Sequence, residues 1–215
     1  QHNKIRRYSH HPDGNGTYKE IVLHVNGVLC GKDLPPQLED LRFRPNQTFH
    51  KGYLKQSVRL TGYSHPTFQA ALDGLSAIAN HISRSFKEGV LVPWSPSEFD
   101  GHPTIEIGNN FFAARKFVPT EPDVPFDAKV DPRGILAQLK DAQYIHTEDN
   151  RVTFWELQED PASAIVLDTI CRYSSADPAI FRDGDIVEAE FSIFAIPQNR
   201  RYRVALVLRL LTLVD

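Results

Sequence analysis

A long apolar hairpin at the C-terminus constrains the fold more than any other part of the sequence. Gly184-Asp185 opens a β-branched run from Ile186 to Ile196, and a second apolar run extends from Tyr202 to Val214. The residues between the runs, Pro197 to Arg201, are polar and turn-forming, as at a hairpin tip. Arms of about eleven residues are roughly twice the usual strand length, so a sheet or barrel has to cover them.

Shorter segments rich in β-branched and aromatic residues indicate further strands. We predict strands at 18–30, 58–61, 104–107, 111–118, 152–157 and 165–173. Asn26-Gly27 is a hairpin or bend signal within the first of these segments, and Gly108 to Asn110 is expected to connect 104–107 and 111–118 as a hairpin turn. The chain therefore contains mostly β-structure.

Two helices are expected. Pro66 suits a first helical turn, and apolar residues recur at three- and four-residue steps from Phe68 to Phe86, with Gly89 as the stop. Asp131-Pro132 starts a short second helix. These elements predict an α+β fold, predominantly antiparallel β (barrel-like or a sandwich), with one long packed helix and one short helix.

Residues 1–17 are polar and basic and predict a flexible arm, and 18–215 predict a single α+β domain with a candidate internal boundary at 119–130, where prolines recur. No leader and no apolar run of about 20 residues is seen. We therefore expect an intracellular protein, nuclear or cytoplasmic, that has no membrane partner. The chain has no methionine. We therefore expect it to be part of a longer protein.

Turn and strand motifs in the second half carry a resemblance. They are Asp131 to Gly134, Glu148 to Val152, Phe181 to Glu188 and Leu208 to Asp215. This part of the chain, about the last eighty residues, resembles an uncharacterised protein family of mushroom-forming (basidiomycete) fungi. The resemblance implies a shared fold and no known activity. Expanded families in such genomes often belong to mobile elements, which implies an association with nucleic acid.

Local clusters of cations and aromatic residues predict binding to DNA or RNA. The net charge of −3 excludes a uniformly basic binder, but cations hold phosphates and flat side chains stack on bases. The predicted contact residues are Arg6, Arg7, Arg42, Arg44, Arg115, Lys116, Phe117, Arg200, Arg201 and Arg203. Stacking is expected from Phe43, Phe112, Phe117 or Tyr202. We therefore predict a nucleic-acid-binding or nucleic-acid-associated module without catalysis of its own and without a cofactor.

Two other functions stay open. A metal-dependent enzyme, similar to an iron oxygenase or a hydrolase, could use His11, Asp13 and His146, because His-x-Asp with a later His forms a facial triad. Glu188 and Glu190 share a strand face and are alternative ligands, although we expect them to pair with Arg201 and Arg203 on the facing arm. A protein-interaction scaffold would instead pair an exposed sheet edge with a partner strand. Cys30 and Cys171 are expected to be core thiols.

Overall fold

The computed structural model describes residues 6–7, 20–36, 51–159 and 171–215. The main helices are α1 (Pro66–Ser83) and α2 (Ile135–Leu139). The strands are β1 (Arg6–Arg7), β2 (Val22–Asp33), β3 (Lys55–Thr61), β4 (Leu91–Val92), β5 (Ser97–Phe99), β6 (His102–Asn110), β7 (Ala113–Ala114), β8 (Tyr144–Ile145), β9 (Thr153–Glu159), β10 (Cys171–Ser175), β11 (Ile186–Gln198) and β12 (Arg201–Leu213). None of the helices in the described stretches is long and apolar enough to cross a membrane.

The predicted C-terminal hairpin is confirmed. β11 and β12 pair antiparallel from Val187↔Leu213 to Gln198↔Arg201, with an irregularity after Glu190. The register places Glu190 opposite Leu210, whereas Arg203 lies opposite Ile196 near the turn. The expected pairing of Glu188 and Glu190 with Arg201 and Arg203 was therefore wrong, because the two sets occupy opposite halves of the hairpin.

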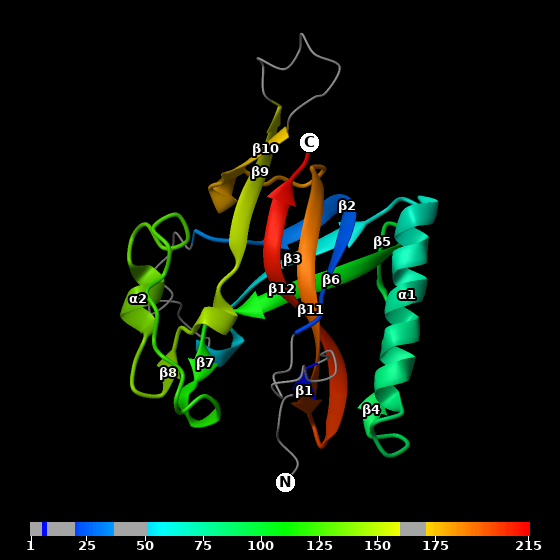
Figure 1. Cartoon of the computed structure of the whole chain (residues 1–215), viewed down its shortest axis with the longest axis horizontal. Coiled ribbons are helices and arrows are strands. Elements are labelled where there is room, and N and C mark those ends of the chain that lie inside the picture. Colours follow the sequence, from blue (N-terminus) through cyan, green and yellow to red (C-terminus); the bar gives the residue numbers. More distant parts are fainter. Residues whose placement is uncertain (1–5, 8–19, 37–50, 160–170) are drawn as a thin grey trace, which may run out of the picture.

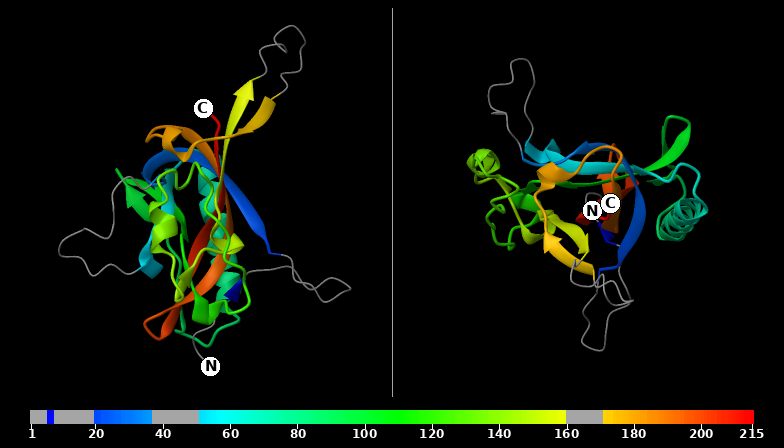
Figure 2. Two further views of the ribbon diagram at one scale, coloured as in Figure 1. Left: turned by 90° about the vertical axis from the view of Figure 1, so that its left-hand side faces the viewer. Right: turned by 90° about the horizontal axis from the view of Figure 1, so that it is seen from above.

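The hairpin is the centre of a curled mixed sheet. The strand order is β10-β9-β12-β11-β2-β3-β6-β5, and β12 pairs parallel with β9 and β4 while the other pairs are antiparallel. Seen from above, the sheet bends round on itself (Figure 2). At the seam, the side-chain amide of Asn109 on β6 donates to the Leu208 carbonyl of β12 at 3.2 Å. The α+β, mainly antiparallel prediction is confirmed, and the barrel is not closed.

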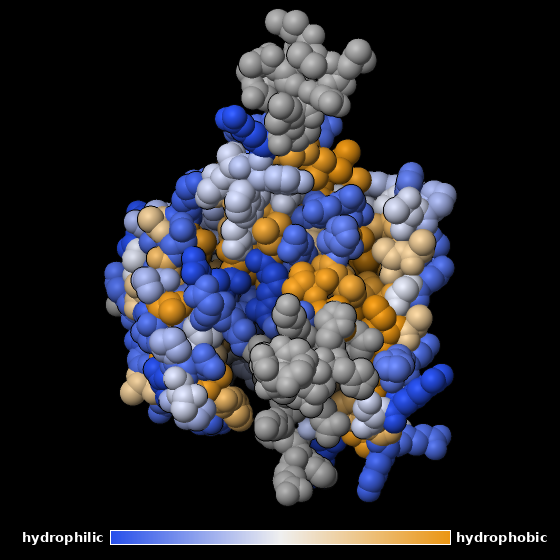
Figure 3. Space-filling view, viewed as in Figure 1, coloured by the Kyte–Doolittle hydropathy of each residue, from blue (hydrophilic) through white to orange (hydrophobic). Residues whose placement is uncertain are grey.

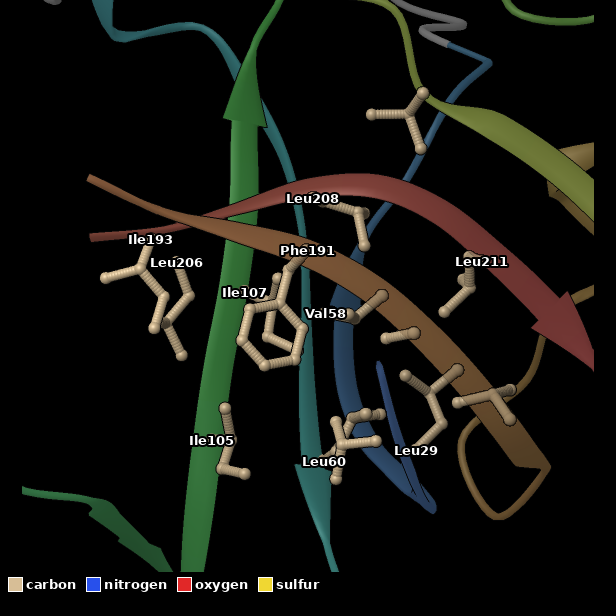
Figure 4. Close-up of a cluster of buried hydrophobic side chains, with 14 of the residues drawn as sticks. Leu29, Val58, Leu60, Ile105, Ile107, Phe191, Ile193, Leu206, Leu208 and Leu211 are labelled. Carbon is tan, nitrogen blue, oxygen red and sulfur yellow. The ribbon is translucent and has the colours of Figure 1, made fainter. Parts of the chain in front are cut away.

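Apolar side chains fill the space that the curled sheet encloses. Alternate residues of β2, β3, β6, β11 and β12 point inward and meet there (Figure 4). These buried residues include Leu29, Val58, Leu60, Ile105, Ile107, Phe191, Ile193, Leu206, Leu208 and Leu211. Residues two apart on a strand share a face, so this alternation defines an inner, apolar face of the sheet and an outer one.

Helix α1 packs beside the sheet (Figure 1). Pro66 is at its start, as predicted, but it ends at Ser83, before Gly89. Phe68 of its first turn lies against Gly27 of β2 and Gly62, where a Cβ atom would come within 3.0 Å and 2.2 Å of the Phe68 side chain. Gly27 therefore lies inside a continuous strand, where its missing side chain leaves room for the helix, so the hairpin turn that Asn26-Gly27 could signal is not formed.

The predicted hairpin between 104–107 and 111–118 was also wrong. β6 continues through Gly108 because its ladder with β3 extends to Lys55↔Asn110. A Cβ atom on Gly108 would lie 2.8 Å from Ser57 Cβ on β3, so this glycine serves the close contact between strands. β7 pairs instead with β8, and together with α2 they form a lobe on the opposite side of the hairpin from α1 (Figure 1).

Candidate nucleic-acid interface

Five exposed cations gather at the end of the molecule that carries the β11–β12 turn. Arg200, Arg201 and Arg203 come from the hairpin itself. Arg84 and Lys87 come from the segment that follows α1. We call these five residues the basic end. Strongly hydrophilic side chains project in this region, at the lower right of the space-filling view (Figure 3).

Backbone pairing fixes the two cationic segments against each other. The amide of Tyr202 donates to the Val90 carbonyl at 2.8 Å. β4 continues this contact as a parallel ladder, with Val92 beside Arg203. The ring of Phe86 lies 5.0 Å from that of Tyr202. Because Phe86 is between Arg84 and Lys87 in sequence, these contacts hold the segment that carries Arg84 and Lys87 next to the hairpin arginines.

Among the residues that the structure describes, few carboxylates neutralise the basic end. In segments 81–92 and 196–205, which form it, Glu88 is the one acidic residue. Glu106 on β6 is also close enough to feel the charge of Arg203. Lys55 donates to Glu106 at 2.7 Å, and this hydrogen bond is the main cause of its lowered pKa. A locally positive surface therefore exists on a chain whose net charge is −3.

The predicted N-terminal cations lie next to the same half of the hairpin. The backbones of Arg6 and Arg7, which form β1, pair with Ala195 and Phe194 of β11. Figure 1 shows β1 beside the lower part of the hairpin, towards its turn. The backbones of Arg6 and Arg7 thus lie against β11, one strand away from the β12 segment that carries Arg201 and Arg203.

The other predicted cations are not brought to this end. Arg115, Lys116 and Phe117 form a short 3-10 turn after β7, on the lobe across the hairpin from α1. Arg115 donates to the Glu121 carbonyl at 2.7 Å, and Lys116 Nζ lies 4.8 Å from the centre of the Phe117 ring, which is 56% exposed. Arg42, Phe43 and Arg44 lie outside the described residues.

Two of the predicted stacking residues are unsuitable. Phe112 is 2% exposed and Tyr202 is buried against Phe86. Both belong to the core, so the expectation that they stack on bases was wrong. Sequence reasoning missed Trp94, which is partly exposed and lines a groove of about 210 Å³ together with Lys87. The signal that could have found it is its position between Pro93 and Pro96, outside any periodic segment.

For the metal-site alternative, His146 is the member of the predicted trio that the structure describes. His11 and Asp13 lie outside the described residues. His146 is 3% exposed, its Nδ1 lies 2.8 Å from the Phe111 carbonyl, and its ring stacks on Phe126 at 3.9 Å. Burial is the main cause of its lowered pKa. The described part of the chain contains no group of three His, Cys, Asp or Glu residues that could hold a metal ion.

His146 borders a small polar cavity of about 70 Å³. A carbonyl carrying no hydrogen can only accept, so Nδ1 donates to Phe111 and the neutral ring keeps Nε2 as an acceptor. Gln56, 2% exposed, also lines the cavity, and its side-chain oxygen has no hydrogen-bond partner. Two acceptors in a space of this size suit ordered water.

The remaining candidates are accounted for by local structure. Glu188 lies 3.4 Å from His24 on the neighbouring strand β2. Cys30 is a buried core thiol, as predicted; its Sγ donates to the Arg59 carbonyl, and burial raises its pKa. Cys171 begins β10, and its side chain lies outside the described part. For the scaffold alternative, β5 and β10 form the two edges of the main strand path.

Comparisons with known proteins identify no family for this chain. No protein-family model matches the sequence, and no curated protein matches it either. One solved structure to which the chain is similar is the crystal structure of gp2.5, a single-stranded DNA binding protein encoded by bacteriophage T7. The two share 12% sequence identity over 92% of this chain and 87% of that chain, with a TM-score of 0.37. This score is too low to carry an argument about this protein.

Proposed function

We propose that the chain is a non-catalytic nucleic-acid-binding module that holds phosphates at the basic end. The observation that carries the proposal is the fixed arrangement of Arg84, Lys87 and the three hairpin arginines on a chain that is acidic as a whole. Clustered cations attract phosphates and release their counterions, and guanidinium groups can bind a phosphate with two parallel hydrogen bonds. The link to mobile elements stays a prediction from the fungal resemblance.

A salt titration of binding tests the proposal. Fluorescence anisotropy with a labelled oligonucleotide gives the affinity at each salt concentration. We expect the logarithm of the affinity to fall linearly with the logarithm of salt, by about 0.7 per phosphate contact on a single strand and about 0.9 on a duplex. The double variant Arg200→Gln/Arg201→Gln should lower the affinity and reduce this slope by the share of two contacts.

A matched control removes two cations elsewhere. Lys32 and Arg182 are exposed and lie near the start of β11, at the opposite end of the hairpin from the turn. Lys32→Gln/Arg182→Gln should leave the slope nearly unchanged. The proposal fails if the protein binds no DNA or RNA, or if the control loses as much affinity as the hairpin variant. Arg115→Gln/Lys116→Gln measures the share of the second predicted segment separately.

A further inference from the structure

The groove beside the basic end shares Lys87 with it and adds side chains that phosphate binding does not use. It lies between the last turns of α1 and the segment Leu91 to Trp94. The β4 ladder to Tyr202 and Arg203 fixes one wall. Neighbours in a ladder project to the same face, so Arg203 projects from the same face as Val92, which lines the groove. The groove and the cations therefore form one continuous surface.

The lining of the groove combines the groups that recognise a nucleotide. The partly exposed Trp94 and the exposed Val92 supply flat and apolar surface. The exposed amide of Asn80 supplies a donor and an acceptor, which suits the edge of a base. Lys87 supplies a cation within the groove itself, and Glu88 an acceptor for amino groups. A purely phosphate-binding surface needs neither the indole nor the amide.

We propose that the Trp94 groove receives one unpaired base of a nucleic-acid strand whose phosphates lie on the basic end. The inference rests on the proposed function and adds the form of the nucleic acid. In a duplex each base is paired and stacked on both faces, so its face cannot stack on a side chain in the Trp94 groove. A base of a single strand can turn out of its stack and pack against an aromatic ring. The protein therefore prefers single strands to duplexes.

The intrinsic fluorescence of Trp94 reports the contact directly. The chain has two tryptophans, and Trp155 on β9 has a buried Nε1 without a hydrogen-bond partner. Trp155→Phe therefore removes no hydrogen bond and leaves Trp94 as the single tryptophan emitter. We expect a single-stranded DNA oligonucleotide to quench this emission, with a midpoint equal to that of binding measured by anisotropy. An abasic oligonucleotide of equal length and charge should bind the basic end without quenching.

Substitution of Trp94 gives a second readout. Trp94→Leu should weaken single-strand binding about tenfold or more, in line with the loss of one base–aromatic stack, and leave abasic binding unchanged. Trp94 also packs partly against the core, so Trp94→Phe, which keeps an aromatic ring, serves as the matched variant and should retain most of the affinity. Circular dichroism checks that both variants are folded.

The two proposals fail in different ways. Equal binding of abasic and normal strands without a change in Trp94 emission, or equal quenching by duplex and single strand, overturns the base-binding groove and leaves phosphate binding intact. No binding of any of these ligands overturns both.

Discussion

Arg200 occupies a backbone conformation that favours glycine. The two residues of the β11–β12 turn, Asn199 and Arg200, have φ values of 46° and 65°. Two-residue turns with positive φ at both positions strongly prefer Asn-Gly, and a side chain in this region costs about 1 to 2 kcal/mol. An arginine at this position thus sacrifices local stability for a cation at the tip of the basic end.

Arg200→Gly is therefore expected to raise the free energy of unfolding by about 1 kcal/mol and to weaken oligonucleotide binding. The control is Arg200→Gln, which removes the same charge but keeps a side chain in the strained conformation. Urea unfolding and anisotropy measure the two effects. If the glycine variant is no more stable than the glutamine variant, the turn is not strained in solution.

His146 makes the stability depend on pH. Burial lowers its pKa in the folded chain below the ordinary value of about 6.5, so the unfolded chain binds more protons near that pH. Its contribution to stability is fully present above about pH 6.5 and is lost as the pH falls towards the lowered pKa. The free energy of unfolding should therefore decrease as the pH falls from about 7 to about 5.

His146→Asn tests this attribution. The asparagine amide can still donate to the Phe111 carbonyl, but it does not titrate. We expect lower stability at neutral pH, because the stack on Phe126 is lost, and a flatter dependence on pH than in the parent chain. Urea unfolding at several pH values gives both quantities. Parallel pH curves for the two proteins would assign the dependence to other groups.

At the scale of elements, the contact of α1 with the sheet depends on missing side chains. Phe68 fills the space above Gly62, so a Cβ atom added to Gly62 would lie 2.2 Å from the Cβ atom of Phe68. Gly62→Ala should therefore destabilise the protein by about 1 to 3 kcal/mol or more, because the helix has to shift.

Gly74→Ala, in the exposed middle of α1 with open space around it, should stabilise by up to about 1 kcal/mol. Thermal unfolding compares the two, and destabilisation by both would show that α1 tolerates no added methyl group.

The elements that the sequence predicts well are those with a local signal. The hairpin arms and α1 have long apolar runs of clear period, and both are confirmed. Gly27 and Gly108 were misjudged because glycine marks a turn and a close contact alike. At Gly27 the neighbour is a helix and at Gly108 it is a strand, and both contacts join segments distant in sequence.

The residues of the candidate site divide in the same way, into those with a local sequence signal and those that depend on contacts between distant segments. The hairpin arginines were predicted, since a basic turn can be read from adjacent residues. Arg84, Lys87 and Trp94 were missed because each looks like ordinary exposed surface when read alone. Their relevance depends on the hydrogen bond from Tyr202 to Val90, which joins residues more than a hundred positions apart. No local pattern specifies that pairing.

At the scale of the whole molecule, the net charge and the basic end act in opposite directions. The chain carries a formal charge of −3, yet five cations lie together at one end. The screening length is about 10 Å at 0.1 M salt and about 30 Å at 0.01 M. A bound strand therefore feels mainly the basic end at physiological salt, and the distant carboxylates as well at low salt.

The logarithmic plot of affinity against salt should consequently flatten at low salt. Glu98 and Glu121 are exposed and lie outside the segments that form the basic end, and Glu98→Gln/Glu121→Gln moves the formal charge from −3 to −1. We expect this variant to bind more tightly than the parent at about 0.01 M salt and equally well at about 0.15 M, because screening then hides the distant charges. Anisotropy titrations across this range measure the difference. If the parent plot stays straight and the variant gains equally at every salt concentration, the carboxylates act directly at the interface, and the bound strand extends beyond the basic end.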